Sequence, residues 1–178
     1  MMSSICSGFS KTCNMLMCRD NSETSTQLNQ MQDFNDLNEK TKENTSLFSL
    51  EGETHDAKIV YIYDGDTMHV VFKKFGQYFR WNCRIMGVDT PELKTKNEIE
   101  KRNGIKVRDA TREQLMDKIV KIHCYNFDKY GRLLIDVVMP KELTTEPELL
   151  LSQWLIQNKY AYAYDGGTKQ SWDSIDLE

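Results

Sequence analysis

The sequence lacks a hydrophobic run of about 18 residues, the length that a membrane-spanning helix needs, so a membrane span is excluded. Residues 1–20 also lack the unbroken apolar core of a signal peptide, and we therefore expect no secretion. The second residue is Met2 and not the glycine that N-myristoylation requires. Because a span and an export signal are both missing, we expect a protein that works inside a cell or a particle.

Zinc-type spacings of cysteine are absent as well, although the chain contains five cysteines. Cys6, Cys13 and Cys18 lie in the polar front of the chain, where they should stay reduced without an export signal. S-acylation of these three thiols would tether the chain to a membrane, but solvated, inert thiols are the favoured interpretation. Cys83 and Cys124 fall on apolar strand faces and are expected in the core.

The net charge of −4 is unevenly distributed and suggests three segments. Residues 1–55 are polar, carry four Lys/Arg against eight Asp/Glu and lack a sustained apolar period, which predicts a disordered tail with at most a transient helix near Gln27 to Lys42. Residues 56–166 are predicted to form one folded domain, and residues 167–178 an acidic C-terminal tail. We expect a monomer.

Runs of β-branched and aromatic residues predict five strands in this domain. They cover residues 58–63, 67–72, 78–88, 120–125 and 132–139. A helical period predicts a helix at 97–118, with Asn103-Gly104 delaying its start, and a later helix with Thr145 as its N-cap. The predicted order is three strands, a helix, two strands and a helix. This is the element order of a five-stranded Greek-key barrel of the OB type, an α+β fold.

The stretch RIMGVDTPE, Arg84 to Glu92, groups polar side chains at the end of an apolar strand. Pro91 stops the strand because it has no N–H for a ladder, and it holds Thr90 in an extended conformation. Arg84 alternates with Cys83 and Ile85 and should therefore face away from both. These residues alone leave two interpretations open, a phosphate-processing site and a capped strand end with a surface ion pair.

Two further turns supply the remaining parts of a metal-assisted phosphodiesterase. Asp66 lies in the Asp-Gly turn after the first strand, and Arg132 follows the turn DKYG, Asp128 to Gly131. Carboxylates such as Asp66 and Asp89 suit Ca²⁺ or Mg²⁺ better than zinc. Glu92 could deprotonate water, while Arg84 and Arg132 could grip a phosphate. The alternative is a set of surface ion pairs, which stabilise little.

Four stretches in this order resemble the thermonuclease family, the staphylococcal nuclease-like domains. They are YDGDT (Tyr63–Thr67), RIMGVDTPE (Arg84–Glu92), FDKYGR (Phe127–Arg132) and AYAY (Ala161–Tyr164). The resemblance covers residues 58–164. It implies an OB-type barrel with about three helices and a calcium-dependent endonuclease that hydrolyses DNA and RNA and leaves 3′-phosphate ends.

Motif positions in the resembling family imply a role for each site residue. Asp66, Asp89 and the Thr90 carbonyl would hold one Ca²⁺ ion, and Asp64 would lie behind them. Glu92 would be the general base, and the catalytic arginines Arg84 and Arg132 would bind the phosphate. Substrate contacts would come from Lys129, Tyr130, Tyr162 and Tyr164, although the last two could instead be core residues that cap the barrel.

The alternative function is a non-catalytic module of the same fold that binds nucleic acid or protein. The complete set of Asp66, Asp89, Glu92, Arg84 and Arg132 favours the enzyme. Either acidic end of the chain could fold over a basic cleft and restrain activity. Neither the preference between DNA and RNA nor the biological target can be predicted from the sequence.

Overall fold

The computed structural model describes residues 17–141 and 148–172 of the chain. The chain divides into two compact units, Met1–Phe48 and Ser49–Glu178. The first contains the helix α1 (Met17–Asn38), which begins earlier and ends earlier than the transient helix expected near Gln27 to Lys42. The predicted N-cap Thr145, like Cys6 and Cys13, lies outside the described residues.

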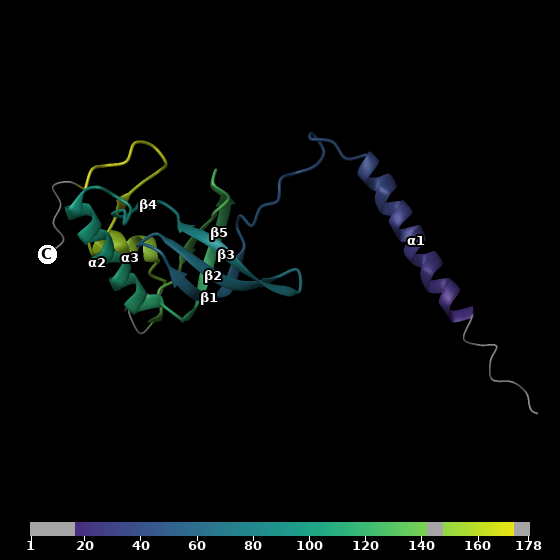
Figure 1. Cartoon of the computed structure of the whole chain (residues 1–178), viewed down its shortest axis with the longest axis horizontal. Helices are drawn as coiled ribbons and strands as arrows, with labels where there is room; N and C mark the ends of the chain where they lie inside the picture. The colour runs from purple at the N-terminus through teal and green to yellow at the C-terminus, as the bar shows by residue number, and fades with distance from the viewer. Residues whose placement is uncertain (1–16, 142–147, 173–178) are drawn as a thin grey trace, which may run out of the picture. The chain divides into compact units, whose positions relative to one another are not determined.

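The second unit is built on a closed barrel of five strands, which confirms the predicted fold (Figure 1). Its strands are β1 (Thr54–Ile62), β2 (Thr67–Lys74), β3 (Gln77–Ile85), β5 (Ile119–Phe127) and β6 (Leu133–Val137). Their order around the barrel is β1-β2-β3-β6-β5, and the β3–β6 pair is parallel while the other four pairs are antiparallel. Phe72, Ile59, Ile62, Ile85 and Ile135 are fully buried in the core, together with Cys83 and Cys124 as expected.

The third strand is shorter than predicted, because it ends at Ile85 and not at Val88. Gly87 adopts a φ of 79°, which side-chain-bearing residues avoid, and turns the chain after Met86. Val88–Asp89 then forms the short strand β4, which pairs with β7 (Tyr162–Ala163) in a separate two-stranded sheet. This small sheet brings the RIMGVDTPE stretch next to the AYAY stretch.

Helix α2 (Glu98–Leu115) starts directly after its N-cap, Asn97, whose side chain accepts hydrogen bonds from the N–H groups of Ile99 and Glu100. The expected delay at Asn103-Gly104 is wrong, since both residues are buried inside the helix. A Cβ on Gly104 would lie 2.9 Å from the carbonyl oxygen of Pro91, so glycine allows α2 to pack closely on the loop that carries Glu92.

Helix α3 (Leu151–Gln157) buries Leu151 and Leu155 against the barrel. Asp136 at the end of β6 fastens its first turn by accepting hydrogen bonds from the Ser152 backbone N–H, at 3.2 Å, and from the Ser152 hydroxyl. Burial raises the pKa of Asp136. Within the described residues, no helix is both long enough and apolar enough to cross a membrane.

Candidate active site

The first part of the site is the turn between β1 and β2. Asp66 there is only 2% exposed, and its Oδ1 accepts a hydrogen bond of 2.9 Å from the Thr67 hydroxyl. A Cβ on Gly65 would lie 2.5 Å from Val107 of α2, so only glycine fits this close approach of turn and helix. The Asp-Gly pair therefore allows the turn to present Asp66 beneath α2.

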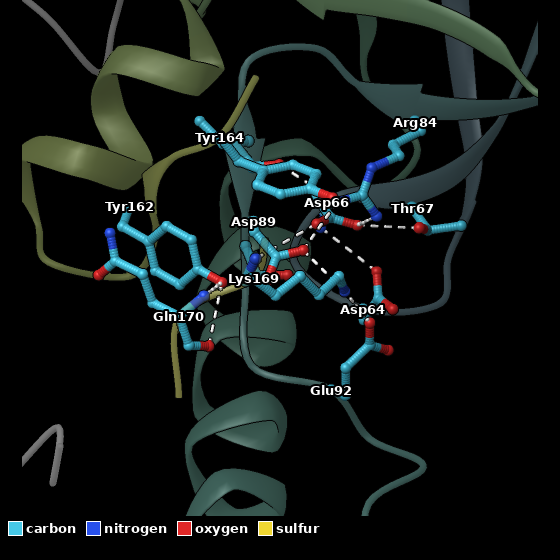
Figure 2. Close-up of polar contacts among 12 residues, drawn as sticks. Asp64, Asp66, Thr67, Arg84, Asp89, Glu92, Tyr162, Tyr164, Lys169 and Gln170 are labelled. Carbon is cyan, nitrogen blue, oxygen red and sulfur yellow. Dashed lines mark hydrogen bonds and ion pairs between the residues drawn. The ribbon is translucent and has the colours of Figure 1, made fainter. Parts of the chain in front are cut away.

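Arg84 at the end of β3 joins the turn to β4 (Figure 2). Its Nη1 lies 3.0 Å from Asp66 Oδ1, and its Nη2 lies 2.9 Å from Asp89 Oδ1. The same Nη2 donates to the Val88 carbonyl at 3.2 Å. Asp89 is 1% exposed, so two buried carboxylates share one guanidinium. Burial works to lower the pKa of Arg84, but Asp66 and Asp89 outweigh it and hold that pKa above its ordinary value.

Burial and neighbouring carboxylates raise the pKa values of Asp64 and Asp66. Burial, followed by repulsion from Asp66 and Glu92, raises the pKa of Asp64 to about 7. Burial also raises the pKa of Asp66, although Arg84 offsets part of the effect. Asp64 Oδ1 accepts the backbone N–H of Asp66 at 3.3 Å and thereby shapes the turn. The site thus holds more negative charge than Arg84 alone balances.

Thr90 and Glu92 extend the site beyond β4. The backbone N–H of Thr90 donates to Asp66 Oδ2 at 3.2 Å, which fastens the loop to the turn. The backbone N–H of Glu92 donates to Glu100 Oε1 of α2 at 3.2 Å. The Glu92 side chain is 42% exposed, so it remains accessible to water on the open side of the buried carboxylates.

Arg132 approaches from the turn before β6. Its Nε lies 2.7 Å from Asp128 Oδ2, and its Nη1 lies 3.5 Å from the Thr67 hydroxyl, which also bonds Asp66. Tyr130 is 72% exposed, and the cations of Lys129 and Arg132 lie 5.1 and 5.6 Å from the centre of its ring. The turn before β6 therefore places two cations and an exposed aromatic ring beside the β1–β2 turn, which carries Asp66.

The segment after β7 contacts the site through residues that the sequence analysis did not select. Lys169 Nζ lies 2.9 Å from Asp89 Oδ1 and 2.7 Å from Glu92 Oε1. The Tyr162 hydroxyl donates to Asp89 Oδ2 at 2.7 Å and accepts the backbone N–H of Gln170 at 2.8 Å. The ring centre of Trp172, which is 4% exposed, lies 5.3 Å from that of Tyr162. Tyr164 donates to the Gly167 carbonyl at 2.9 Å.

Comparison with known proteins assigns the family. The family described as staphylococcal nuclease homologue matches residues 82–175. This chain belongs to that family. A thermonuclease of Staphylococcus hyicus is 33% identical over 91 residues, which are 50% of this chain and 52% of that protein. The chain therefore spans about half the length of this curated relative, and the family is one of nucleases.

The predicted metal ligands, Asp66 and Asp89, can be compared with what a calcium ion requires. The donors fit this ion in chemistry, because Asp66 and Asp89 offer the carboxylate oxygens that Ca²⁺ prefers and the surplus negative charge calls for a cation. Within residues 17–141 and 148–172, no three Asp, Glu, His or Cys side chains are arranged as a ready-made metal site. Arg84 and Lys169 instead donate to these oxygens. The donor types fit calcium, and the present arrangement is held together by cationic side chains.

The structure brings most of the predicted site residues of this nuclease homologue together. Asp64, Asp66, Arg84, Asp89, Thr90 and Glu92 form one network, with Tyr162 on its edge. Arg132 is connected to it only through Thr67, and Tyr164 contacts its own loop. Lys169 and Trp172 were missed, since a lone lysine and a lone tryptophan in a polar segment form no periodic pattern.

Proposed function

We propose that this chain is a calcium-dependent endonuclease that hydrolyses phosphodiester bonds of DNA and RNA and leaves 3′-phosphate ends. The observation that carries the proposal is the network in which Arg84 joins Asp66 and Asp89 beside Glu92. Surface ion pairs contribute little to stability, but these two aspartates are almost fully buried, and a fold gains little from burying such charge without a function.

Each residue of the network has a role in this proposal. Asp66, Asp89 and the carbonyl of Thr90 would hold the calcium ion, which would supply positive charge against the phosphate. Glu92 would accept a proton from the attacking water, because its exposed carboxylate lies where water can reach it. The water oxygen would bond to phosphorus as the bond from phosphorus to the 5′ oxygen breaks, and the 5′ oxygen would take a proton from solvent and leave as a hydroxyl.

The two arginines would stabilise the negative charge that builds on the phosphate oxygens. Arg84 already binds two carboxylates through separate Nη atoms, so the same fork can donate hydrogen bonds to two phosphate oxygens. Arg132 would contact the phosphate from the side of Thr67. Lys129, Tyr130, Tyr162 and Tyr164 would contact the substrate, with aromatic rings stacking on bases regardless of sequence.

The ends of the products test this chemistry. The protein is incubated with a defined single-stranded DNA and RNA, with calcium or with a chelator. A 3′-phosphate end blocks a polymerase until phosphatase removes it, and a 5′-hydroxyl end accepts label from a polynucleotide kinase directly. Products with extendable 3′ ends, or equal cleavage with the chelator, would contradict the proposal.

A second candidate is a non-catalytic module that binds nucleic acid. It is favoured by the pairing of Glu92 with Lys169 at 2.7 Å, because a protonated amine on the carboxylate competes with its use as a base. In this case the folded protein binds both nucleic acids without cleaving either. We further propose that the protein is a monomer, that it acts inside a cell or particle, and that its domain covers residues 56–166. Tethering through Cys6, Cys13 and Cys18 is the less favoured alternative.

A further inference from the structure

The amine of Lys169 lies among the acidic groups of the site (Figure 2). Its Nζ lies 2.9 Å from Asp89 Oδ1 and 2.7 Å from Glu92 Oε1. Asp89 Oδ1 also accepts Arg84, and Asp89 Oδ2 accepts the Tyr162 hydroxyl at 2.7 Å. Both oxygens of a proposed calcium ligand therefore already bond to donors of the chain itself.

Charge explains why an amine is held there. Asp66 and Asp89 share the single guanidinium of Arg84, and Glu92 is ion-paired with Lys169, so Arg84 alone does not match the carboxylates of the site. Burial works to lower the pKa of Lys169, but hydrogen bonds to Glu92 and Asp89 outweigh it and raise that pKa above its ordinary value. The amine lies within ion-pair distance of two carboxylates and so acts as the second cation of the site.

The chain around Lys169 forms a strap, which we define as residues 165–172. Gly166 has a φ of 96°, and the Gly167 carbonyl accepts the Tyr164 hydroxyl, so the strap turns back toward the barrel. Its far end is held by the backbone of Gln170, whose N–H donates a hydrogen bond of 2.8 Å to the Tyr162 hydroxyl. Trp172 packs near the Tyr162 ring.

Lys169, Gln170 and Trp172 of the strap contact the site and the ring of Tyr162. Apart from Lys169, the hydrogen bonds just described all involve the hydroxyls of Tyr162 and Tyr164 or the strap's own backbone. The indole N–H of Trp172 is buried and has no hydrogen-bond partner among residues 17–141 and 148–172, which costs free energy in the closed position. Release of the Lys169 amine would remove the two ion pairs that join the strap to Asp89 and Glu92.

We propose that Lys169 is a built-in counter-cation that competes with calcium for Asp89 and Glu92, so that the strap opens when the metal binds. This inference rests on the proposed function. A divalent cation needs the Asp89 oxygens that Lys169 and Tyr162 occupy, and two cations on one carboxylate oxygen repel each other. Lys169 thereby weakens calcium binding, and the same competition frees Glu92 from its ion pair.

Calcium affinity is the first test, measured by isothermal titration calorimetry on the full chain. Lys169→Met is expected to bind calcium at least about tenfold more tightly than the wild type. Lys101→Met is the matched control, because Lys101 is exposed on α2 and carries the same charge. It should change the affinity by no more than about twofold. Lys169→Gln serves as a second variant should the methionine variant fail to fold.

Trp172 reports the opening of the strap independently of affinity. On addition of calcium, Trp172 emission in the wild type should shift to longer wavelength as the buried indole becomes hydrated. Trp172→Phe should lack this shift, while emission from Trp81 and Trp154 remains.

The outcomes separate this inference from the proposed function. Equal calcium affinities in wild type and Lys169→Met, without a shift of Trp172, would overturn the inference while calcium dependence stands. Calcium binding by Lys169→Met but not by the wild type would support the inference. If neither protein binds calcium in the millimolar range, both the metal in the proposed function and this role of Lys169 are wrong.

Discussion

Arg84 is the residue on which the geometry of the site depends most. Its two Nη atoms hold Asp66 at 3.0 Å and Asp89 at 2.9 Å, and these aspartates come from separate segments. A lysine could not bridge the same pair, because its single ammonium group lacks the planar fork. Alternation along β3 predicted that Arg84 faces away from Cys83 and Ile85, and the structure places it on the carboxylates.

We expect Arg84→Met to lower the free energy of unfolding by about 3–5 kcal/mol, because it leaves the buried Asp66 without its ion-pair partner and Asp89 with Lys169 alone. Urea denaturation at pH 7 measures the change. Arg80→Met is the matched control on the same strand, where the side chain is exposed, and should change stability by less than about 0.5 kcal/mol. Similar losses in both variants would show that Arg84 does not hold the network together.

At the scale of elements, the packing of α2 against the loop 90–93 positions Glu92. Alanine normally stabilises a helix by about 1 kcal/mol relative to glycine. Gly104→Ala should do the opposite and destabilise the protein by about 1–3 kcal/mol, since its Cβ would lie 2.9 Å from the Pro91 carbonyl oxygen. Thermal unfolding tests this prediction, and an increase in melting temperature would refute it.

The tie between β6 and α3 gives a pH dependence. The pKa of Asp136 is raised above 3.8 in the folded protein, mainly by burial, so its proton stabilises the fold at low pH and this contribution is lost as pH rises through the folded-state pKa. Asp136→Asn keeps an acceptor for the Ser152 N–H but does not titrate. Its stability relative to wild type should therefore rise between pH 4 and pH 7.

Urea denaturation at several pH values measures this difference. Asp109→Asn is a useful comparison, because hydrogen bonding to Arg108 lowers the pKa of Asp109 and the dependence should have the opposite sign. Its size should be small, since the Asp109 side chain is 55% exposed. A parallel pH dependence of both variants would contradict the burial of Asp136.

Sequence patterns predicted elements that have a period or a cap. Alternation located the barrel strands, and the helical period located α2, but neither pattern could locate β4 and β7, because two-residue strands have no period. Asn103-Gly104 was misleading, since glycine here serves close packing and not a break in the helix. Local residue types predicted the carboxylates, whereas the contact of Lys169 depends on how the chain returns to the barrel.

At the scale of the whole molecule, the residue that the C-terminal segment places on the site is basic and not acidic. The hypothesis drawn from the sequence was that either acidic end could fold over a basic cleft and restrain activity. The described part of the C-terminal segment instead brings its lysine, Lys169, onto acidic groups. Net charge per segment could not predict this contact, because one lysine among acidic neighbours determines it.

Plasmid DNA cleavage by wild type and Glu92→Gln, with calcium added or chelated, tests the central claim most directly. We expect calcium-dependent cleavage that falls by about 10²- to 10⁴-fold in the variant, because glutamine cannot accept the proton of water. Glu98→Gln, an exposed position on α2, should cleave at the wild-type rate. Equal cleavage by Glu92→Gln and wild type, or no cleavage by folded wild-type protein that binds the DNA, would contradict the account.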